Sequence, residues 1–329
     1  MASSSRHDPY RQLVLATGNL TETNVMGILN SAFKRTHEEV LNGLRGTLHA
    51  TTQTDPAATT TSGVHYDATT CTLTVEHPEC TPAATRCSET DSTDDLQLTG
   101  MERSKLFLYP QKDEATADLA EEQVVAAIRL LRQRTGLSQI CNFTVAFTDF
   151  KLDDDEDDED EDDEDAVDRR HVLSNGNSAR AAGSSASFWP DMTYYRHVWK
   201  ALEKEHGQGG IKELGVSEFA RKRLDAFLST ITTTPASNQV NLTDCCVMPR
   251  ALIAYCRDRG IELVTHSDSS DMFSASELAQ LLQQFPTIEG HAPVGTSSIT
   301  VHWLLKLSVM VQSRGVLCDK GYIVFATCE

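Results

Sequence analysis

Cysteine is the first residue type in this chain that suggests chemistry, because thiolates bind zinc, act as nucleophiles and form disulfides. The chain of 329 residues has nine cysteines, at positions 71, 80, 87, 141, 245, 246, 256, 318 and 328. No two of them have the two-residue gap with which one turn clamps a zinc ion. We therefore expect no metal site, and mostly reduced thiols buried as small apolar groups in a cytoplasmic protein.

One pair of cysteines is adjacent, Cys245 and Cys246, in the stretch NLTDCCVMPR. Neighbouring side chains point in different directions on a regular backbone, so this pair is a poor metal site. Two interpretations stay open: both thiols are buried, or the loop contacts a partner and responds to oxidation. The motifs of serine hydrolases, P-loop nucleotide-binding proteins and zinc proteases are absent, and the histidines show no ligand spacing.

The acidity of the chain is concentrated in one segment. Residues 153–165 are thirteen consecutive acids, and without them the formal charge changes from −19 to −6. Because the rest of the chain is still slightly acidic, we expect it to have no strong attraction for nucleic acid or anionic membranes. Like charges at this density stay hydrated, so 151–190 is predicted to be a disordered acidic insertion. It is either a solvated spacer or an electrostatic segment that guards a basic partner surface or mimics a polyanion. No apolar run is long enough to cross a membrane.

Strands and helices alternate along most of the chain, and these elements must position any functional side chain. Residues 51–100 are instead predicted to be an irregular Thr/Ser-rich connection with at most one edge strand. The predicted strands are 13–18, 71–77, 105–110, 140–150, 210–217, 237–242, 261–267 and 321–328. The predicted helices are 21–44, 118–136, 193–207, 218–231, 248–260, 275–285 and 302–315.

This alternation with short loops predicts an α/β fold with parallel strands. Enough such units closing on themselves would give a (β/α)8 barrel, here one domain over residues 1–329. A doubly wound open sheet is the alternative. It would normally carry a Gly-rich phosphate-binding turn after an early strand, and the early turn ATGNL lacks that spacing.

Three stretches carry a resemblance to a known family: IKELGVSEFARKRLDAF, SNQVNLTDCCVMPRALIAYCRDRGIELVTHSD and SRGVLCDKGYI. Together with ATGNL, they resemble the modifier (regulatory) subunit of glutamate–cysteine ligase, which belongs by fold to the aldo-keto reductase superfamily. The NQV portion is shared with the reductases, whereas the CCVMP extension resembles the modifier subunit. The resemblance is dense from about 210 to 325 and absent from 51–100 and from the acidic insertion.

The resemblance implies a barrel without catalysis of its own. Such a subunit forms a heterodimer with the catalytic subunit of the ligase, improves its use of glutamate and weakens feedback inhibition by glutathione. A covalent link through an N-terminal thiol is unavailable here, because no cysteine precedes Cys71. The expected partner contacts are Asn241, Cys245, Cys246, Met248, Pro249, Ser313, Arg314 and Gly315.

A reductase of this superfamily is the alternative. Its chemistry requires a tyrosine proton donor, a lysine that lowers the pKa of that tyrosine, an aspartate and a histidine. Lys105 matches the lysine, but Phe147 or Thr148 stands where the histidine is expected. The residue five before Tyr66 is Thr61 where the aspartate is expected. We therefore expect no enzyme activity and regard Lys105 as a remnant.

Residues on the cofactor side match the reductases better. Ser217, Asn238 and Gln239 stand at positions that hold the nicotinamide amide, and His266 replaces the stacking aromatic residue. Alternatively, the two amides satisfy backbone groups at strand ends. No cofactor is expected, although NADPH binding stays open. The alternatives to a regulatory subunit are thus an NADPH-dependent aldo-keto reductase or an NADPH-sensing barrel.

Overall fold

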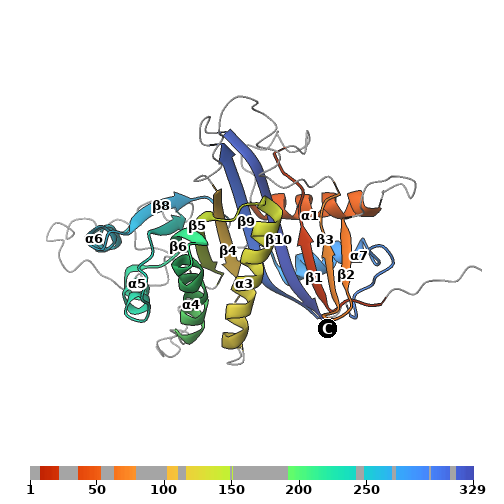
Figure 1. Ribbon diagram of the computed structural model, residues 1–329, viewed down its shortest axis with the longest axis horizontal. Coiled ribbons are helices and arrows are strands. Elements are labelled where there is room, and N and C mark those ends of the chain that lie inside the picture. Colours follow the sequence, from red (N-terminus) through yellow and green to blue (C-terminus); the bar gives the residue numbers. More distant parts are fainter. Residues whose placement is uncertain are drawn as a thin grey trace, which may run out of the picture.

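The computed structural model describes residues 8–21, 36–52, 63–78, 102–109, 116–148, 150, 192–241, 248–268, 272–295, 298–311 and 316–329 (Figure 1). The strands are β1 (Gln12–Ala16), β2 (Val64–Asp67), β3 (Thr72–Val75), β4 (Glu102–Leu108), β5 (Ile140–Phe147), β6 (Ile211–Ser217), β7 (Ser237–Asn241), β8 (Glu262–His266), β9 (Ile299–Val311) and β10 (Val316–Cys328). The helices are α1 (Thr36–Thr52), α3 (Thr116–Thr135), α4 (Thr193–Gly207), α5 (Arg221–Leu228), α6 (Arg250–Asp258) and α7 (Ala275–Gln283).

All of these strands join one sheet in the order β2-β3-β1-β10-β9-β4-β5-β6-β7-β8. Strands β4 to β8 are mutually parallel, which confirms the predicted α/β class. Among the described strands the sheet does not close into a ring, because β2 and β8 form its two edges (Figure 1). On the other side of β4, the sheet continues with antiparallel β9 and β10 and not with another parallel strand.

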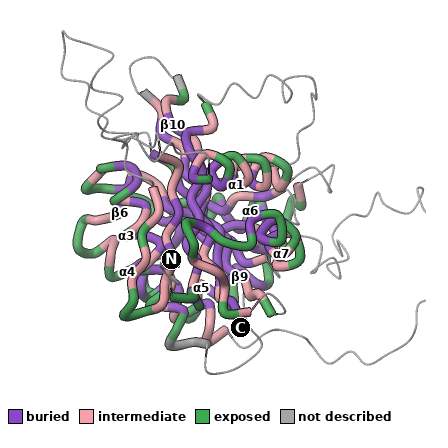
Figure 2. The backbone as a smooth tube through the Cα atoms, turned by 90° about the vertical axis from the view of Figure 1, so that its right-hand side faces the viewer, coloured by how far each residue is buried: buried purple, intermediate pink, exposed green. Residues whose placement is uncertain are grey.

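The sheet has two buried faces, because side chains alternate along each strand. On β1, Val14 and Ala16 join a core with α3, α4, α5 and α6, which we call the α3 face. Leu13 and Leu15 join a second core with α1 and α7, which we call the α1 face. The buried chain is therefore concentrated in the sheet between the two helical layers (Figure 2).

One helix start and two helix ends follow local chemistry. Ser274 and Glu277 form a reciprocal capping box at the start of α7. Gly136 and Gly260, which were predicted to end helices, have φ angles of 71° and 69°. This left-handed conformation favours glycine and stops the helix.

The predicted helix over 302–315 is wrong for 302–311, because these residues belong to β9, which pairs with β10 and β4, whereas 312–315 lie outside the described residues. Trp303 and Leu305 lie in the core of the α3 face, and Leu304 lies in the core of the α1 face. A strand that is buried on both faces is apolar in every direction, as a buried helix is, so periodicity cannot separate the two.

Three other predictions differ from the structure or lie outside it. The first helix was predicted over 21–44, but α1 runs from Thr36 to Thr52, and 22–35 lie outside the described residues. The predicted irregular connection over 51–100 contains the antiparallel pair β2 and β3, and β3 is an inner strand. The acidic insertion over 151–190 lies outside the described residues.

Candidate functional site

The parallel strands bring the predicted site residues together on neighbouring strands. Ser217 of β6 pairs in register with Gln239 of β7, and Asn241 of β7 pairs with His266 of β8. These residues lie at or next to the carboxyl ends of their strands, the end that carries function in α/β folds. The structure therefore brings these residues together and adds charged partners to them.

Asp268, which follows β8, joins two lysines from distant parts of the chain. Its Oδ2 accepts a hydrogen bond from Lys105 Nζ at 3.1 Å, and its Oδ1 accepts one from Lys306 Nζ at 2.6 Å. The side chains of Lys105 and Asp268 are only 7% and 5% exposed. Such a buried, paired carboxylate holds both ammonium groups in place.

Burial and charge oppose each other in this cluster. Burial lowers the pKa of Lys105 to about 8, although Asp268 acts in the opposite direction. For Asp268, burial alone would raise the pKa, but the ammonium groups of Lys105 and Lys306 bring it well below its ordinary value. Asp268 is therefore an anion at neutral pH, and its charge is balanced within the protein.

His266 is held by contacts on both ring nitrogens. Its Nδ1 accepts a hydrogen bond from the backbone N–H of Asp268 at 3.2 Å. Its Nε2 lies 2.6 Å from Glu218 Oε1. With both nitrogens engaged, the ring is fixed in orientation.

Glu218 connects the loops after β6 and β7. It has a φ angle of 62°, which is unusual for a residue with a side chain. Its backbone N–H donates to the carbonyl of Gln239 at 2.8 Å, and its Oε1 accepts from the backbone N–H of Asn241 at 2.8 Å. The Asn241 side chain in turn donates to the carbonyl of Asp268 at 3.0 Å. The cluster therefore ties three successive strand ends together.

The residues matched to nicotinamide binding do not fit that group as they are arranged. The side chain of Asn238 is fully buried, with its Nδ2 donating to the carbonyl of Phe219 at 2.8 Å and its Oδ1 facing the Phe219 N–H at 3.4 Å. Gln239 Nε2 donates to Thr144 Oγ1 at 3.0 Å, and Ser217 Oγ donates to the carbonyl of Gln239 at 3.1 Å. These groups satisfy the protein itself, so we derive no step through a nicotinamide.

The reductase tetrad is not assembled around Lys105. Among the described residues, the hydrogen bond of its ammonium group goes to Asp268 and none goes to a tyrosine. Phe147, at the expected histidine position, packs edge-on against Tyr195 at 4.6 Å between ring centroids in the α3-face core. Without a phenol beside it, this lysine cannot assist proton donation to a carbonyl.

The predicted partner contacts are only partly covered by the structure. Asn241 belongs to the cluster above, Met248 packs partly buried against the α3-face core, and Pro249 precedes α6. The remaining candidates, Cys245, Cys246, Ser313, Arg314 and Gly315, lie outside the described residues.

Cys318 is disulfide-bonded, which corrects the expectation of reduced thiols at that position. Among the described residues, no group of three or more acidic, cysteine or histidine side chains is arranged to hold a metal ion.

Sequence reasoning missed three members of the cluster: Glu218, Asp268 and Lys306. Glu218 and Asp268 directly follow or lie close to the ends of parallel strands, and this placement is a signal that could have identified them. Lys306 gave no such signal, because its segment was predicted to be a helix and the residue therefore did not stand near a predicted strand end.

The aldo/keto reductase family model matches residues 98–270 of the chain, which is more than half of it. The human glutamate–cysteine ligase regulatory subunit is 36% identical over 136 residues, covering 41% of this chain and 47% of that protein. A putative regulatory subunit of the same ligase from Schizosaccharomyces pombe is 31% identical over 130 residues, covering 40% and 43%.

A pig protein, aldo-keto reductase family 1 member A1, is 30% identical over 151 residues, covering 44% of this chain and 46% of that protein. The chain thus spans about half the length of the curated relatives it matches. None of the described helices is long and apolar enough to cross a membrane.

Proposed function

Because the chain belongs to the aldo/keto reductase family and is homologous to regulatory subunits of glutamate–cysteine ligase, we propose that it is itself such a regulatory subunit. In this role it binds the catalytic subunit of the ligase as a heterodimer in the cytoplasm. It improves the use of glutamate by that subunit and relieves feedback inhibition by glutathione. It thereby acts in glutathione biosynthesis without catalysing a reaction of its own.

The observation that carries this proposal is the 36% identity to the human regulatory subunit. The site chemistry supports it against the reductase alternative. Lys105 is paired with Asp268, and the side-chain amide of Asn238 is hydrogen-bonded to the backbone of Phe219. A cluster that is satisfied internally is suited to fixing the strand ends, whereas catalysis requires groups that are free to meet a substrate.

The loop between β7 and α6 is the proposed contact region. It includes Cys245 and Cys246, and it joins Asn241, which is anchored to the cluster, to Pro249 at the start of α6. Loops after barrel strands commonly carry function. A Cys245→Ser/Cys246→Ser double variant is therefore expected to activate the partner less or to lose sensitivity to oxidants. Normal activation with and without oxidant would remove this loop from the proposal.

The test is the ligase activity of a matched catalytic subunit at low glutamate, with and without this protein. We expect a lower apparent KM for glutamate and co-elution of the two chains as a 1:1 complex. An unrelated protein at the same concentration is the control. If no complex forms and the kinetics do not change, the proposal is wrong. A screen for NADPH-dependent reduction of carbonyl compounds would then test the alternative.

A further inference from the structure

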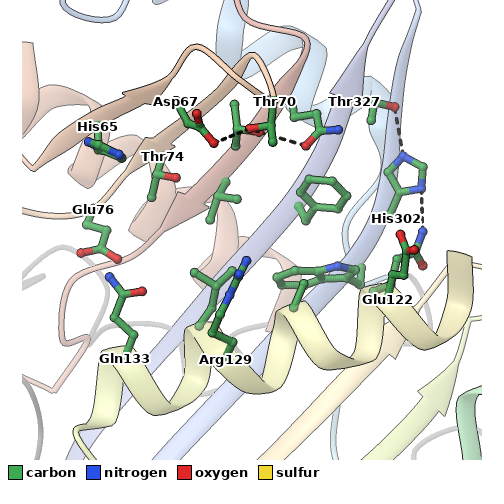
Figure 3. Close-up of a pocket in the computed structure, with 18 of the residues that line it drawn as sticks. His65, Asp67, Thr70, Thr74, Glu76, Glu122, Arg129, Gln133, His302 and Thr327 are labelled. Carbon is green, nitrogen blue, oxygen red and sulfur yellow. Dashed lines mark hydrogen bonds between the residues drawn. The ribbon is translucent and has the colours of Figure 1, made fainter. Parts of the chain in front are cut away.

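A groove of about 930 Å³ lies on the α3 face, between helix α3 and the antiparallel half of the sheet (Figure 3). One wall is α3, the floor comes from β1, β9 and β10, and the other wall comes from β2 and β3. We call it the α3 groove. Its lining includes charged side chains (Asp67, Glu76, Glu122 and Arg129) and apolar or aromatic ones (Leu119, Ala126, His302, Trp303 and Phe325).

Among the described residues, the layer of helices on the α3 face is interrupted at this groove. Opposite it, the α1 face of the same strands is covered by α1 and α7. On the α3 face, the described residues place α3 at the side of the groove and no helix over β10, β1 and β3. The four strands from β9 to β3 span three strand spacings, or roughly 14 Å, which accommodates one helix of about 10–12 Å diameter.

The wall formed by α3 presents a stripe with helical spacing. Leu119, Glu122, Ala126 and Arg129 all line the groove, at intervals of three or four residues. Leu119 is 46% exposed, although it is a large apolar side chain. An apolar residue on this stripe favours contact with another apolar surface over contact with water.

The floor is aromatic and is shaped by a β-bulge. The register between β9 and β10 shifts between Phe325 and Ala326, so that His302 is the extra residue and lines the groove together with its neighbour Trp303. Trp303 and Phe325 are stacked, with ring centroids 5.7 Å apart. Gln123 Nε2 donates a hydrogen bond to His302 Nδ1 at 3.3 Å, which connects the floor to the α3 wall. The other ring nitrogen, Nε2, is hydrogen-bonded to Thr327 Oγ1 at 3.0 Å (Figure 3).

Acidic groups dominate the charges along the groove. Asp67 and Glu76 lie on the β2–β3 side, Glu122 lies on the α3 side, and Arg129 is the one formal cation among the lining residues (Figure 3). Three acids against one base attract a segment with an excess of lysine or arginine. Combined with the exposed side chain of Leu119 and the partly buried ring of Phe325, this charge favours an amphipathic helix with a basic polar face.

We propose that the α3 groove seats a basic amphipathic helix of the ligase catalytic subunit, alongside α3. This inference rests on the proposed function and adds to it the surface of contact. The apolar side of the partner helix lies over Phe325, which packs on the buried Trp303, and against Leu119. Its basic side chains reach Glu122 on one side and Asp67 and Glu76 on the other.

The test uses three lysine substitutions on α3 in the full-length protein. Leu119→Lys and Glu122→Lys change the groove wall, and Val125→Lys is the matched control. Val125 is 47% exposed on the same helix and does not line the groove. Circular dichroism and thermal unfolding of each variant establish that the fold is retained, as expected for exposed positions. The dissociation constant for the catalytic subunit is then measured by titration calorimetry.

We expect each groove variant to weaken binding by about tenfold or more, and the Val125→Lys variant to bind within about twofold of the unmodified protein. Binding by Glu122→Lys should also be less sensitive to salt, because one attractive charge is reversed. If the unmodified protein binds and both groove variants bind equally well, the groove is not the contact surface, and the proposed function stands. If the unmodified protein does not bind at all, both proposals fail.

Discussion

Lys105 of β4 and Lys306 of β9 stand directly opposite each other in the antiparallel pair, and both bind the carboxylate of Asp268. Like charges opposite each other in a sheet are destabilising. The single carboxylate between them removes that repulsion and also attaches the loop after β8 to the two strands. The residue at the centre of the site is therefore a structural counter-ion for two lysines.

Removing this counter-ion is expected to destabilise the fold. Asp268→Asn keeps the shape of the side chain but leaves the buried Lys105 ammonium unpaired. We expect a loss of about 3–5 kcal/mol in the free energy of unfolding, measured by urea denaturation at pH 7. Lys306→Met is the control and should cost about 1 kcal/mol or less, because Lys306 is 25% exposed. A loss below about 1 kcal/mol for Asp268→Asn would contradict this role.

The pH dependence of stability should contain a contribution from Glu102, at the start of β4. Its side chain is buried and Oε2 has no hydrogen-bond partner, whereas Oε1 accepts from Ser104 at 2.8 Å. Burial raises its pKa to about 7. Between pH 4.5 and 7 the folded state therefore binds more protons than the unfolded state, and this group makes the protein less stable as the pH rises.

A Glu102→Gln variant tests this contribution, because glutamine is neutral at every pH. The free energy of unfolding of the variant minus that of the unmodified protein should increase by roughly 1–3 kcal/mol between pH 4.5 and 8. The measurement is denaturant unfolding at several pH values across this range. A difference that stays constant with pH would show that Glu102 does not titrate there.

The described free cysteines should differ in reactivity. Cys256 and Cys328 are buried, and burial raises the pKa of each thiol to about 11. At pH 8 only about one such thiol in a thousand is the reactive thiolate. Iodoacetamide should therefore modify the half-buried Cys71 well before either of them, as measured by peptide mass spectrometry. Labelling in guanidinium chloride, where all thiols are accessible, is the control. Equal native rates at the three sites would contradict the burial argument.

Local sequence signals located much of the α/β half of the molecule. The strands 140–150, 210–217 and 261–267 and the helices between them correspond to β5, β6, β8 and their neighbours. Among their local signals, Gly209 and Gly260 follow α4 and α6 with φ angles of 75° and 69°, and such glycine stops act within a few residues. Ser217, Gln239 and His266 were instead singled out by the family resemblance, and the structure places them on neighbouring parallel strands, whose carboxyl ends lie on one edge of the sheet.

The sequence by itself thus determined the α/β class and the resemblance to a family. Only the tertiary structure decided that 299–311 is a strand, because an apolar segment becomes helix or strand according to the surfaces that bury it. It also decided that Asp268 forms ion pairs with both Lys105, which is 163 residues away in the chain, and Lys306. Such a contact leaves no local trace, since its free energy depends on a distance that the whole fold must set.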